Sequence, residues 1–294
     1  MAAAGQPPRL GVCSWSLQTH DLDELLARVA ACGVTGVQLA LEPLRRGVWS
    51  AEDTLAKLTR AGVEPLSGML APEGEDYSTL DTIRATGGFR PDATWGENRG
   101  RVAETAYLAR RLGLELVTFH AGFLPHGADD PERAVLLDRL RHVADVFADQ
   151  GVAVALETGQ ETAETLEQVL HDLGRPSVGV NFDPANMLLY GMGEPVEALE
   201  RLLPWVRQVH VKDARRAADP GQWGEEVPVG IGEVRWDAFF DVLARKHPRV
   251  DLVIEREAGD ARVADVATAR ALVEREAARV GLGLAGLTAE EATA

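Results

Sequence analysis

The sequence predicts an α/β protein whose single domain is a (β/α)8 barrel. Short apolar runs typical of strands recur along the chain, and segments with helical periodicity separate them. Parallel strands need a crossover helix between them, and eight such units close a sheet into a barrel. A doubly wound open sheet is the alternative fold, but no glycine-rich dinucleotide motif follows the first strand.

The elements follow one another as eight strand–helix units. Ser50 is a suitable cap for the helix at 51–61, and Asp130 precedes a helix that begins with Pro131. Glycines suited to a left-handed C-cap follow five helices, at Gly33, Gly62, Gly113, Gly151 and Gly174. The predicted strands are 10–15, 36–40, 63–69, 115–120, 152–157, 177–183, 206–212 and 251–255. The predicted helices are 21–32, 51–61, 98–113, 131–149, 162–173, 194–203, 236–246 and 261–280. We therefore expect a flexible N-terminus at 1–8, the barrel at 9–280, and a tail outside it at 281–294.

Four predicted strands end in a residue that can bind a metal ion. These residues are Glu157 in VAVALE, Asp183 in SVGVNFD, His210 in RQVHVKD and Glu255 in VDLVIE. Because side chains alternate along a strand, each ligand lies on the face with the smaller or more polar residues, while branched apolar residues occupy the other face. Three carboxylates and one imidazole suit one divalent ion, Mn²⁺ first and Mg²⁺ or Co²⁺ as alternatives, better than a structural zinc.

Two predicted connections, 70–97 and 214–235, are unusually long. Both leave the carboxyl end of a strand, where barrel enzymes place their sites, and long ordered loops are commonly lids or binding loops. We expect both to border the metal, with Trp95 and Trp223 in a substrate wall. Asp213, at the start of the second connection, either orients His210 or anchors the loop.

The composition limits the classes of molecule that the protein is expected to bind. A net charge of −16 argues against nucleic acid, and no apolar run reaches membrane-spanning length. The first residues lack the pattern of a signal peptide, and the two cysteines, Cys13 and Cys32, are too few for a disulfide framework. We expect a cytoplasmic protein with reduced thiols that acts on a small molecule, a sugar or keto glycoside. Assembly into a homo-oligomer stays open.

From LGVCSW to IERE the chain resembles the sugar isomerase/epimerase-like TIM barrels. This group contains D-tagatose 3-epimerase, hydroxypyruvate isomerase and inosose dehydratase, belongs to the xylose isomerase-like superfamily, and includes endonuclease IV more distantly. The most specific segments are NFDPANMLLYG, VHVKDA, VPVGIGEVRWDAFF and VIERE. The resemblance implies that Glu157, Asp183, His210 and Glu255 bind the metal, and that Glu157 and Glu255 also transfer protons.

At several positions the chain differs from the pattern of the family that it resembles. His120 matches a frequent active-site position, but the epimerases usually have His where this chain has Asn186, and Glu where it has Gln38. Asn186 and the stretch KDARR lack the histidines of an endonuclease IV-like site. The departures leave the reaction open.

We predict a metal-dependent epimerase or isomerase that acts on a keto sugar through a metal-bound enediolate, with Glu157 and Glu255 as the acid/base pair. One alternative is a lyase or dehydratase of the same fold, acting by β-elimination on a 3-keto glycoside or an inosose. Another is a non-catalytic sugar-binding barrel, which would not need two carboxylates facing each other across a metal. Lys212 shares the face of His210 and either contacts an oxyanion or forms a salt bridge. The residues expected to contact substrate are Trp15, Gln38, Trp95, His120, Asn186, Lys212 and Trp223.

Overall fold

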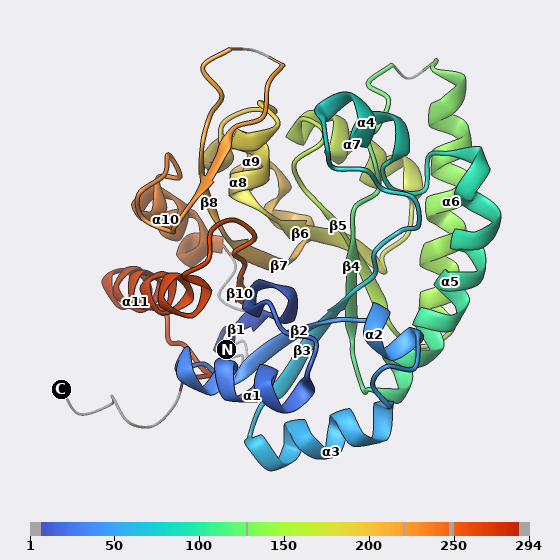
Figure 1. Ribbon diagram of the computed structural model, residues 1–294. Coiled ribbons are helices and arrows are strands. Elements are labelled where there is room, and N and C mark those ends of the chain that lie inside the picture. Colours follow the sequence, from blue (N-terminus) through green and yellow to red (C-terminus); the bar gives the residue numbers. More distant parts are fainter. Residues whose placement is uncertain (1–6, 128, 220, 247–249, 288–294) are drawn as a thin grey trace, which may run out of the picture.

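The computed structural model describes residues 7–127, 129–219, 221–246 and 250–287. Eight parallel strands form a closed barrel in the order β1-β10-β7-β6-β5-β4-β3-β2, which confirms the predicted fold class. Figure 1 shows helices surrounding these strands. The barrel strands are β1 (Leu10–Cys13), β2 (Gly36–Ala40), β3 (Glu64–Met69), β4 (Leu116–Phe119), β5 (Ala153–Glu157), β6 (Val178–Phe182), β7 (Val206–Val211) and β10 (Asp251–Ile254).

The helices follow the predicted crossover pattern. Those of the barrel wall are α1 (Leu22–Ala31), α3 (Ala51–Ala61), α5 (Asp92–Arg111), α6 (Pro131–Ala148), α7 (Ala163–Leu173), α9 (Pro195–Leu202), α10 (Trp236–Lys246) and α11 (Arg262–Val280). Shorter pieces are α2 (Glu42–Arg45), α4 (Leu80–Thr86), α8 (Pro184–Leu189) and the 3₁₀ turns η1 (Ser14–Leu17) and η2 (Leu203–Trp205). None of the described helices is long and apolar enough to cross a membrane.

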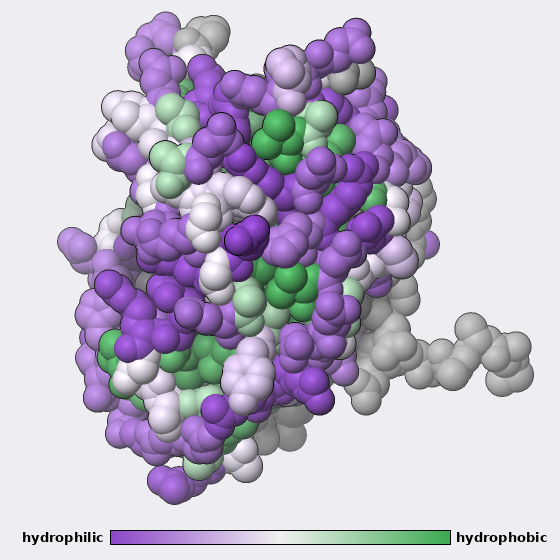
Figure 2. Space-filling view, turned by 90° about the vertical axis from the view of Figure 1, so that its right-hand side faces the viewer, coloured by the Kyte–Doolittle hydropathy of each residue, from purple (hydrophilic) through white to green (hydrophobic). Residues whose placement is uncertain are grey.

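The main apolar core lies between the strands and the helices. Outward-facing strand residues such as Val154, Val180 and Val209 are fully buried there. Burial of such side chains contributes about 1.5–3 kcal/mol each. The inward faces are smaller or more polar, as the alternation predicted, and enclose the separate small cluster of Cys13, Leu66 and Val253. On the face seen in Figure 2, hydrophilic residues dominate and the apolar patches are small and separate.

Helix α5 begins at Asp92, earlier than the predicted residue 98. Gly96 and Gly100 weaken the helical signal in this stretch, because glycine is a poor helix former. Tertiary contacts compensate: the guanidinium of Arg139 on α6 donates to the carbonyls of Phe89 and Arg90 and pairs with Asp92. The start of α5 is therefore stabilised by its neighbour and not by its own sequence.

Both chain ends are expected to lie outside the barrel, and the described residues next to them, 7–9 and 281–287, contact each other. Ala285 N donates to the carbonyl of Pro8 at 2.8 Å, and Leu10 N donates to the carbonyl of Ala285 at 2.8 Å. The chain from 281 to 287 also packs Leu282, Leu284 and Leu287 against the core. These apolar side chains cover part of the core, which explains why this segment is held. Residues 1–6 and 288–294 lie outside the described part.

Both long connections leave the carboxyl ends of their strands and contain regular structure. Segment 70–97 includes α4, and segment 214–235 belongs to a hairpin of β8 (Asp213–Arg215) and β9 (Glu225–Val227). Asp213 anchors this hairpin. Its buried carboxylate accepts hydrogen bonds from the backbone N–H groups of Ala214, Gly230, Gly232 and Val234 and from the indole of Trp236.

A side chain at position 232 would not fit, because its Cβ would lie 2.1 Å from the Asp213 carboxylate. The glycine-rich segment VPVGIGEV thus binds an internal carboxylate. Of the two roles considered for Asp213, the structure supports the loop anchor.

Candidate metal centre and substrate cavity

Four neighbouring strands bring one metal-type ligand each to a single point. Glu157 ends β5, Asp183 follows β6, His210 lies in β7 and Glu255 follows β10. All four are buried, and one ligand atom from each lies within 4.8 Å of the others. From His210 Nδ1, the distances are 3.5 Å to Glu157 Oε1, 3.8 Å to Asp183 Oδ2 and 3.4 Å to Glu255 Oε2. The structure therefore brings the predicted ligands together.

Two of these ligand atoms, Asp183 Oδ2 and His210 Nδ1, are buried and have no hydrogen-bond partner among the described residues. Polar atoms are rarely buried without a partner, and a bound metal ion commonly takes that place in a cluster of carboxylates and imidazoles. Asp183 Oδ1 is already used, because it accepts from the backbone N–H of Asn186 at 2.9 Å and caps α8. The free oxygen thus points at the imidazole and the other carboxylates.

Gln38 determines which nitrogen of His210 faces the carboxylates. Gln38 Nε2 donates to Thr118 Oγ1 at 2.8 Å, so its Oε1 faces His210 Nε2 at 2.7 Å and can only accept. This contact favours a proton on His210 Nε2, so that loss of one proton from the imidazolium leaves the lone pair on Nδ1. A hydrogen bond of this kind from the outer nitrogen is typical of histidines that bind metals.

The two glutamates are held as carboxylates by donors on every side. Glu157 accepts from Asn186 Nδ2 at 2.9 Å and from Asn181 Nδ2 at 3.2 Å. Glu255 accepts from the indole of Trp15 at 2.8 Å and from Lys212 Nζ at 2.9 Å. Gly159 permits the first of these arrangements: its φ is +141°, and a Cβ there would lie 2.4 Å from Asn186 Cβ.

The charges around the site shift the pKa values of these groups. Burial alone would raise the pKa of Glu255, but Lys212 and His210 hold it well below its ordinary value. Burial likewise opposes ionisation of Glu157, yet His120 and His210 lower its pKa. Burial raises the pKa of Asp183 to about 6. For His210 burial lowers the pKa, and the charges of Glu157 and Glu255 outweigh it and raise the pKa well above the ordinary value.

This donor set fits a divalent cation. The donor set consists of three carboxylate oxygens and one imidazole nitrogen, and two of these four atoms have no hydrogen-bond partner among the described residues. It matches the oxygen-rich ligation that Mn²⁺ and Mg²⁺ prefer. Without a cation, His120, His210 and Lys212 are the neighbouring groups, within the described part of the chain, that offset the charges of the three buried carboxylates. Four protein ligands leave coordination positions open for substrate oxygens.

A cavity of about 430 Å³ lies above the ligand cluster at the carboxyl end of the barrel. Both long connections contribute to it, segment 70–97 through Glu75 and Tyr77, and segment 214–235 through Trp223. The other lining residues are Trp15, Ala40, Glu42, Met69, Ala71, His120, Asn186, Leu189, Tyr190, Lys212, Glu255 and Glu257.

Most predicted substrate contacts line this cavity. Trp15, His120, Asn186, Lys212 and Trp223 do so. Within the set, His120 Nε2 lies 3.6 Å from Glu157 Oε1, and Lys212 pairs with Glu255.

Two predicted contacts lie elsewhere. Gln38 is fully buried below the ligands, against His210. Trp95 is on α5, where it packs against Phe89 and His142 and where the guanidinium of Arg139 lies 5.3 Å from its ring. The side chain of Trp95 is thus packed away from the cavity, so the prediction that it forms part of a substrate wall is wrong.

Sequence reasoning missed Glu75, Tyr190, Glu257 and Asn181 as site residues. Glu257 lies two positions after Glu255 and Asn181 two before Asp183, so strand alternation could have identified both. Glu257 Oε2 accepts from Lys212 Nζ at 2.5 Å, and Glu75 Oε1 accepts from Gly88 N at 2.9 Å. Burial raises the pKa of Glu75. Glu75 lies within a long connection whose path the sequence pattern does not define.

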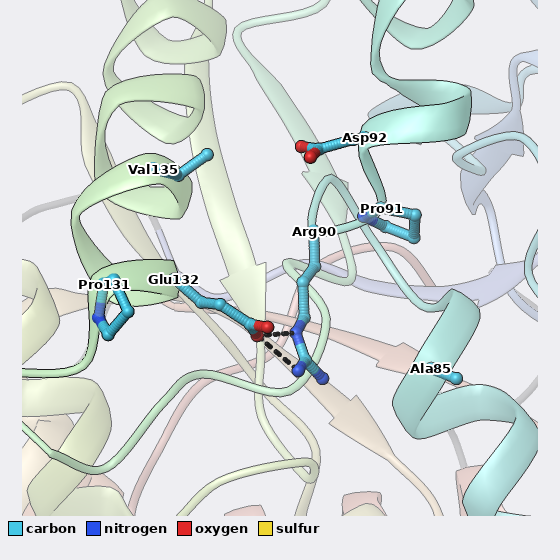
Figure 3. Close-up of a pocket in the computed structure, with 7 residues that line it drawn as sticks. All are labelled: Ala85, Arg90, Pro91, Asp92, Pro131, Glu132 and Val135. Atoms are coloured by element: carbon cyan, nitrogen blue, oxygen red, sulfur yellow. Dashed lines mark hydrogen bonds and ion pairs between the residues drawn. The ribbon is translucent and has the colours of Figure 1, made fainter.

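A second hollow, of about 450 Å³, lies between α4, the start of α5 and α6 (Figure 3). Arg90 bridges it by donating to Glu132 at 2.8 Å. The other lining residues are Ala85, Pro91, Asp92, Pro131 and Val135. This lining holds an ion pair and, among the described residues, no cluster of metal-type ligands, so we assign it no function.

Comparison with known proteins places this geometry among related barrels. The xylose isomerase domain protein from Planctomyces limnophilus is 31% identical, with a TM-score of 0.82 over 94% of this chain and 98% of that one. The 3-dehydroshikimate dehydratase from Bacillus anthracis is 31% identical over 90 residues, which are 29% of this chain and 32% of that protein. The curated relatives are matched over less than half of their length.

Two further solved structures share the fold at low identity. An L-ribulose 3-epimerase is 17% identical, with a TM-score of 0.71 over 93% of this chain and 96% of that one. A xylose isomerase-like TIM barrel protein from Mycobacterium smegmatis in complex with magnesium is 16% identical, with a TM-score of 0.70 over 95% of this chain and 99% of that one. A family model for xylose isomerase-like TIM barrels matches residues 26–278. The chain belongs to the xylose isomerase-like TIM barrel family.

Proposed function

We propose that this protein is a divalent-metal-dependent epimerase or isomerase of a keto sugar, with Mn²⁺ as its ion and Mg²⁺ or Co²⁺ as alternatives. The observation that carries the proposal is the pair of buried glutamates, Glu157 and Glu255. They come from the outer two of the four ligand strands, and both are ionised because neighbouring cations lower their pKa values. The ion, when bound, would polarise a substrate carbonyl and make the neighbouring C–H more acidic.

The residues of the chain divide the proton transfers between them. One ionised glutamate removes the proton from the carbon beside the carbonyl and leaves an enediolate. The other glutamate first takes up a proton from solvent and then delivers it to the enediolate, which inverts the carbon or moves the carbonyl. The first glutamate releases its proton to solvent. Lys212 Nζ donates to Glu255 at 2.9 Å and to Asn186 Oδ1 at 3.3 Å, so it holds these two side chains beside the site. Asn186 and Asn181 hold Glu157 in place.

A lyase is the second candidate, and His120 supports it. His120 lines the cavity, and its Nδ1 has no partner among the described residues. Burial lowers its pKa, but Glu157 and Glu75 raise it above the ordinary value. An imidazolium there could protonate a leaving oxygen β to the carbon that Glu157 deprotonates. The similarity to a dehydratase over 90 residues agrees with this reaction class.

Exchange in D₂O separates the two candidates. Protein saturated with Mn²⁺ is incubated with ketohexoses and, separately, with 3-keto glucosides. Deuterium in the sugar without loss of a substituent identifies an epimerase or isomerase, whereas an unsaturated product or a released aglycone identifies a lyase. The chelator-treated protein is the control. If neither substrate class exchanges deuterium with the metal-loaded protein, then the proposed proton abstraction is wrong.

A further inference from the structure

The cavity has two unlike halves. The ligands come from the strands β5, β6, β7 and β10, whereas the opposite wall comes from β1, β2 and β3 and the residues that follow them. On that wall the lining residues include Trp15, Ala40, Met69 and Ala71. A sugar ring that reaches the ligands therefore has these apolar side chains beside it, together with Glu42 and Glu75, which come from the same wall.

Aromatic side chains extend this apolar surface above the ligands. Tyr190 and Trp223 pack together with ring centroids 4.7 Å apart, and Leu189 adjoins them. All three line the cavity; Tyr190 and Trp223 are partly exposed, and Leu189 is buried. Trp223 comes from the long connection after β7, and Tyr190 follows α8, so neither belongs to the barrel strands. Paired aromatic rings of this kind favour a flat apolar ligand group.

Within the described part of the chain, the cavity lining offers an anionic substrate no lysine or arginine without a carboxylate partner, and its one imidazole, His120, lies 3.6 Å from Glu157 Oε1. Among the residues that the structure describes, Lys212 is the one lysine or arginine in the lining. Its ammonium already donates to Glu255, Glu257 and Asn186. The carboxyl groups of Glu75 and Glu257 also face the cavity. A substrate carboxylate or phosphate would lose its hydration and meet acidic groups, which is unfavourable.

We propose that the substrate is an uncharged glycoside, with its keto sugar ring at the ligand cluster and an apolar aglycone against Tyr190 and Trp223. This inference rests on the proposed function and adds the class of substrate to it. A cavity of about 430 Å³ supports it, because pockets of roughly 300–1,000 Å³ bind drug-sized ligands and a free hexose is smaller than those.

Equilibrium binding tests the aglycone half of the proposal without turnover. The Mn²⁺-saturated protein is titrated with methyl β-D-glucopyranoside and phenyl β-D-glucopyranoside, which lack the reactive carbonyl. We expect the phenyl glycoside to bind about tenfold tighter or more, a preference that burial of one aromatic ring can supply. Trp223→Ala should abolish most of the preference, and Trp223→Phe should retain it. Tyr107→Ala, on the outer face of α5 with Tyr107 59% exposed, is the matched control and should change nothing.

The charge half is tested with phenyl β-D-glucuronide. This titration also uses the Mn²⁺-saturated protein, because the proposal concerns the protein with its ion bound. We expect binding about tenfold weaker or more than that of the phenyl glucoside under the same conditions. Equal binding of the methyl and phenyl glycosides would overturn the aglycone subsite, and equal or tighter binding of the glucuronide would overturn the exclusion of anions. If either fails while ketohexoses still exchange deuterium, the proposed function stands and only the substrate class is wrong.

Discussion

Replacing Glu157 or Glu255 with Gln separates proton transfer from metal binding. Gln keeps an oxygen that can coordinate but loses the base. Removing a general base typically costs about 10²–10⁴ in turnover, which is roughly 2.7–5.4 kcal/mol of transition-state stabilisation. We expect each variant to lose turnover by this amount even when it is saturated with Mn²⁺.

The hydrogen bonds at Glu157 add a second, smaller effect. Its two oxygens accept from the amides of Asn186 and Asn181, so the NH₂ group of a Gln must face one of these donors. One lost or opposed hydrogen bond costs on the order of 1–3 kcal/mol. This loss weakens the site and lowers metal affinity. Turnover must therefore be measured at saturating Mn²⁺, with the Mn²⁺ dissociation constant determined separately by calorimetry.

Asp183→Asn is the matched control for these variants. Asp183 Oδ1 caps α8 and Oδ2 has no partner among the described residues, so Asn keeps the cap and removes mainly the ligand charge. We expect weaker Mn²⁺ binding and partial recovery of turnover as Mn²⁺ is raised. The assay is deuterium exchange of a ketohexose in D₂O. If the two Gln variants regain near wild-type exchange once saturated with metal, neither glutamate is the base, and His120 or Lys212 becomes the leading candidate.

Three further predictions concern the groups around the ligands. Carboxylates raise the pKa of His210 in the metal-free protein, so Mn²⁺ must displace its proton; affinity should rise with pH until that raised pKa is passed, and calorimetry in two buffers should detect the released proton. Gln38→Leu removes the acceptor that fixes the tautomer of His210 and should weaken Mn²⁺ binding about 10–100-fold, while Gln38→Glu should preserve it; equal affinities for all three proteins would contradict the role of Gln38. Asp213→Ala leaves several buried donors unpaired and should lower the free energy of unfolding in urea by about 3–5 kcal/mol; the exposed Asp219→Ala is the control, and equal effects would exclude an anchoring role.

The ligand cluster could be predicted from the sequence because it depends on two local rules. Alternation along a strand fixes which face a residue occupies, and parallel strands end at the same rim. Glu157, Asp183 and His210 satisfy both rules within short, clearly apolar runs. No knowledge of the register between strands is needed to expect that they converge.

The polar network beneath the ligands depends on that register. Gln38 reaches His210 from β2 across the barrel interior, and Asn181 reaches Glu157 because the two residues are paired between β5 and β6. Their spacing in sequence carries no sign of either contact. The sequence also does not show where the side chain of Trp95 lies, because an aromatic residue in a long connection could face either the cavity or the core. The contact of its ring with Arg139 decides between them.

The candidate ligands and the aromatic surface are held in place by different parts of the barrel. The four candidate ligands lie at the ends of strands or directly after them, where the parallel hydrogen bonds of the barrel restrict their movement. The aromatic surface belongs to the connections, but it is not loosely attached: Asp213, three residues after His210, ties the second connection to the ligand strand through backbone N–H groups of 230–234. The wall that would select the substrate is thus positioned by the same strand that presents the imidazole. The hydrogen bonds of Asp213, and not the side chain at position 223, hold the second connection in place beside the candidate ligands. Substitutions at Trp223 should therefore change which substrate is bound and leave the ligand geometry unchanged.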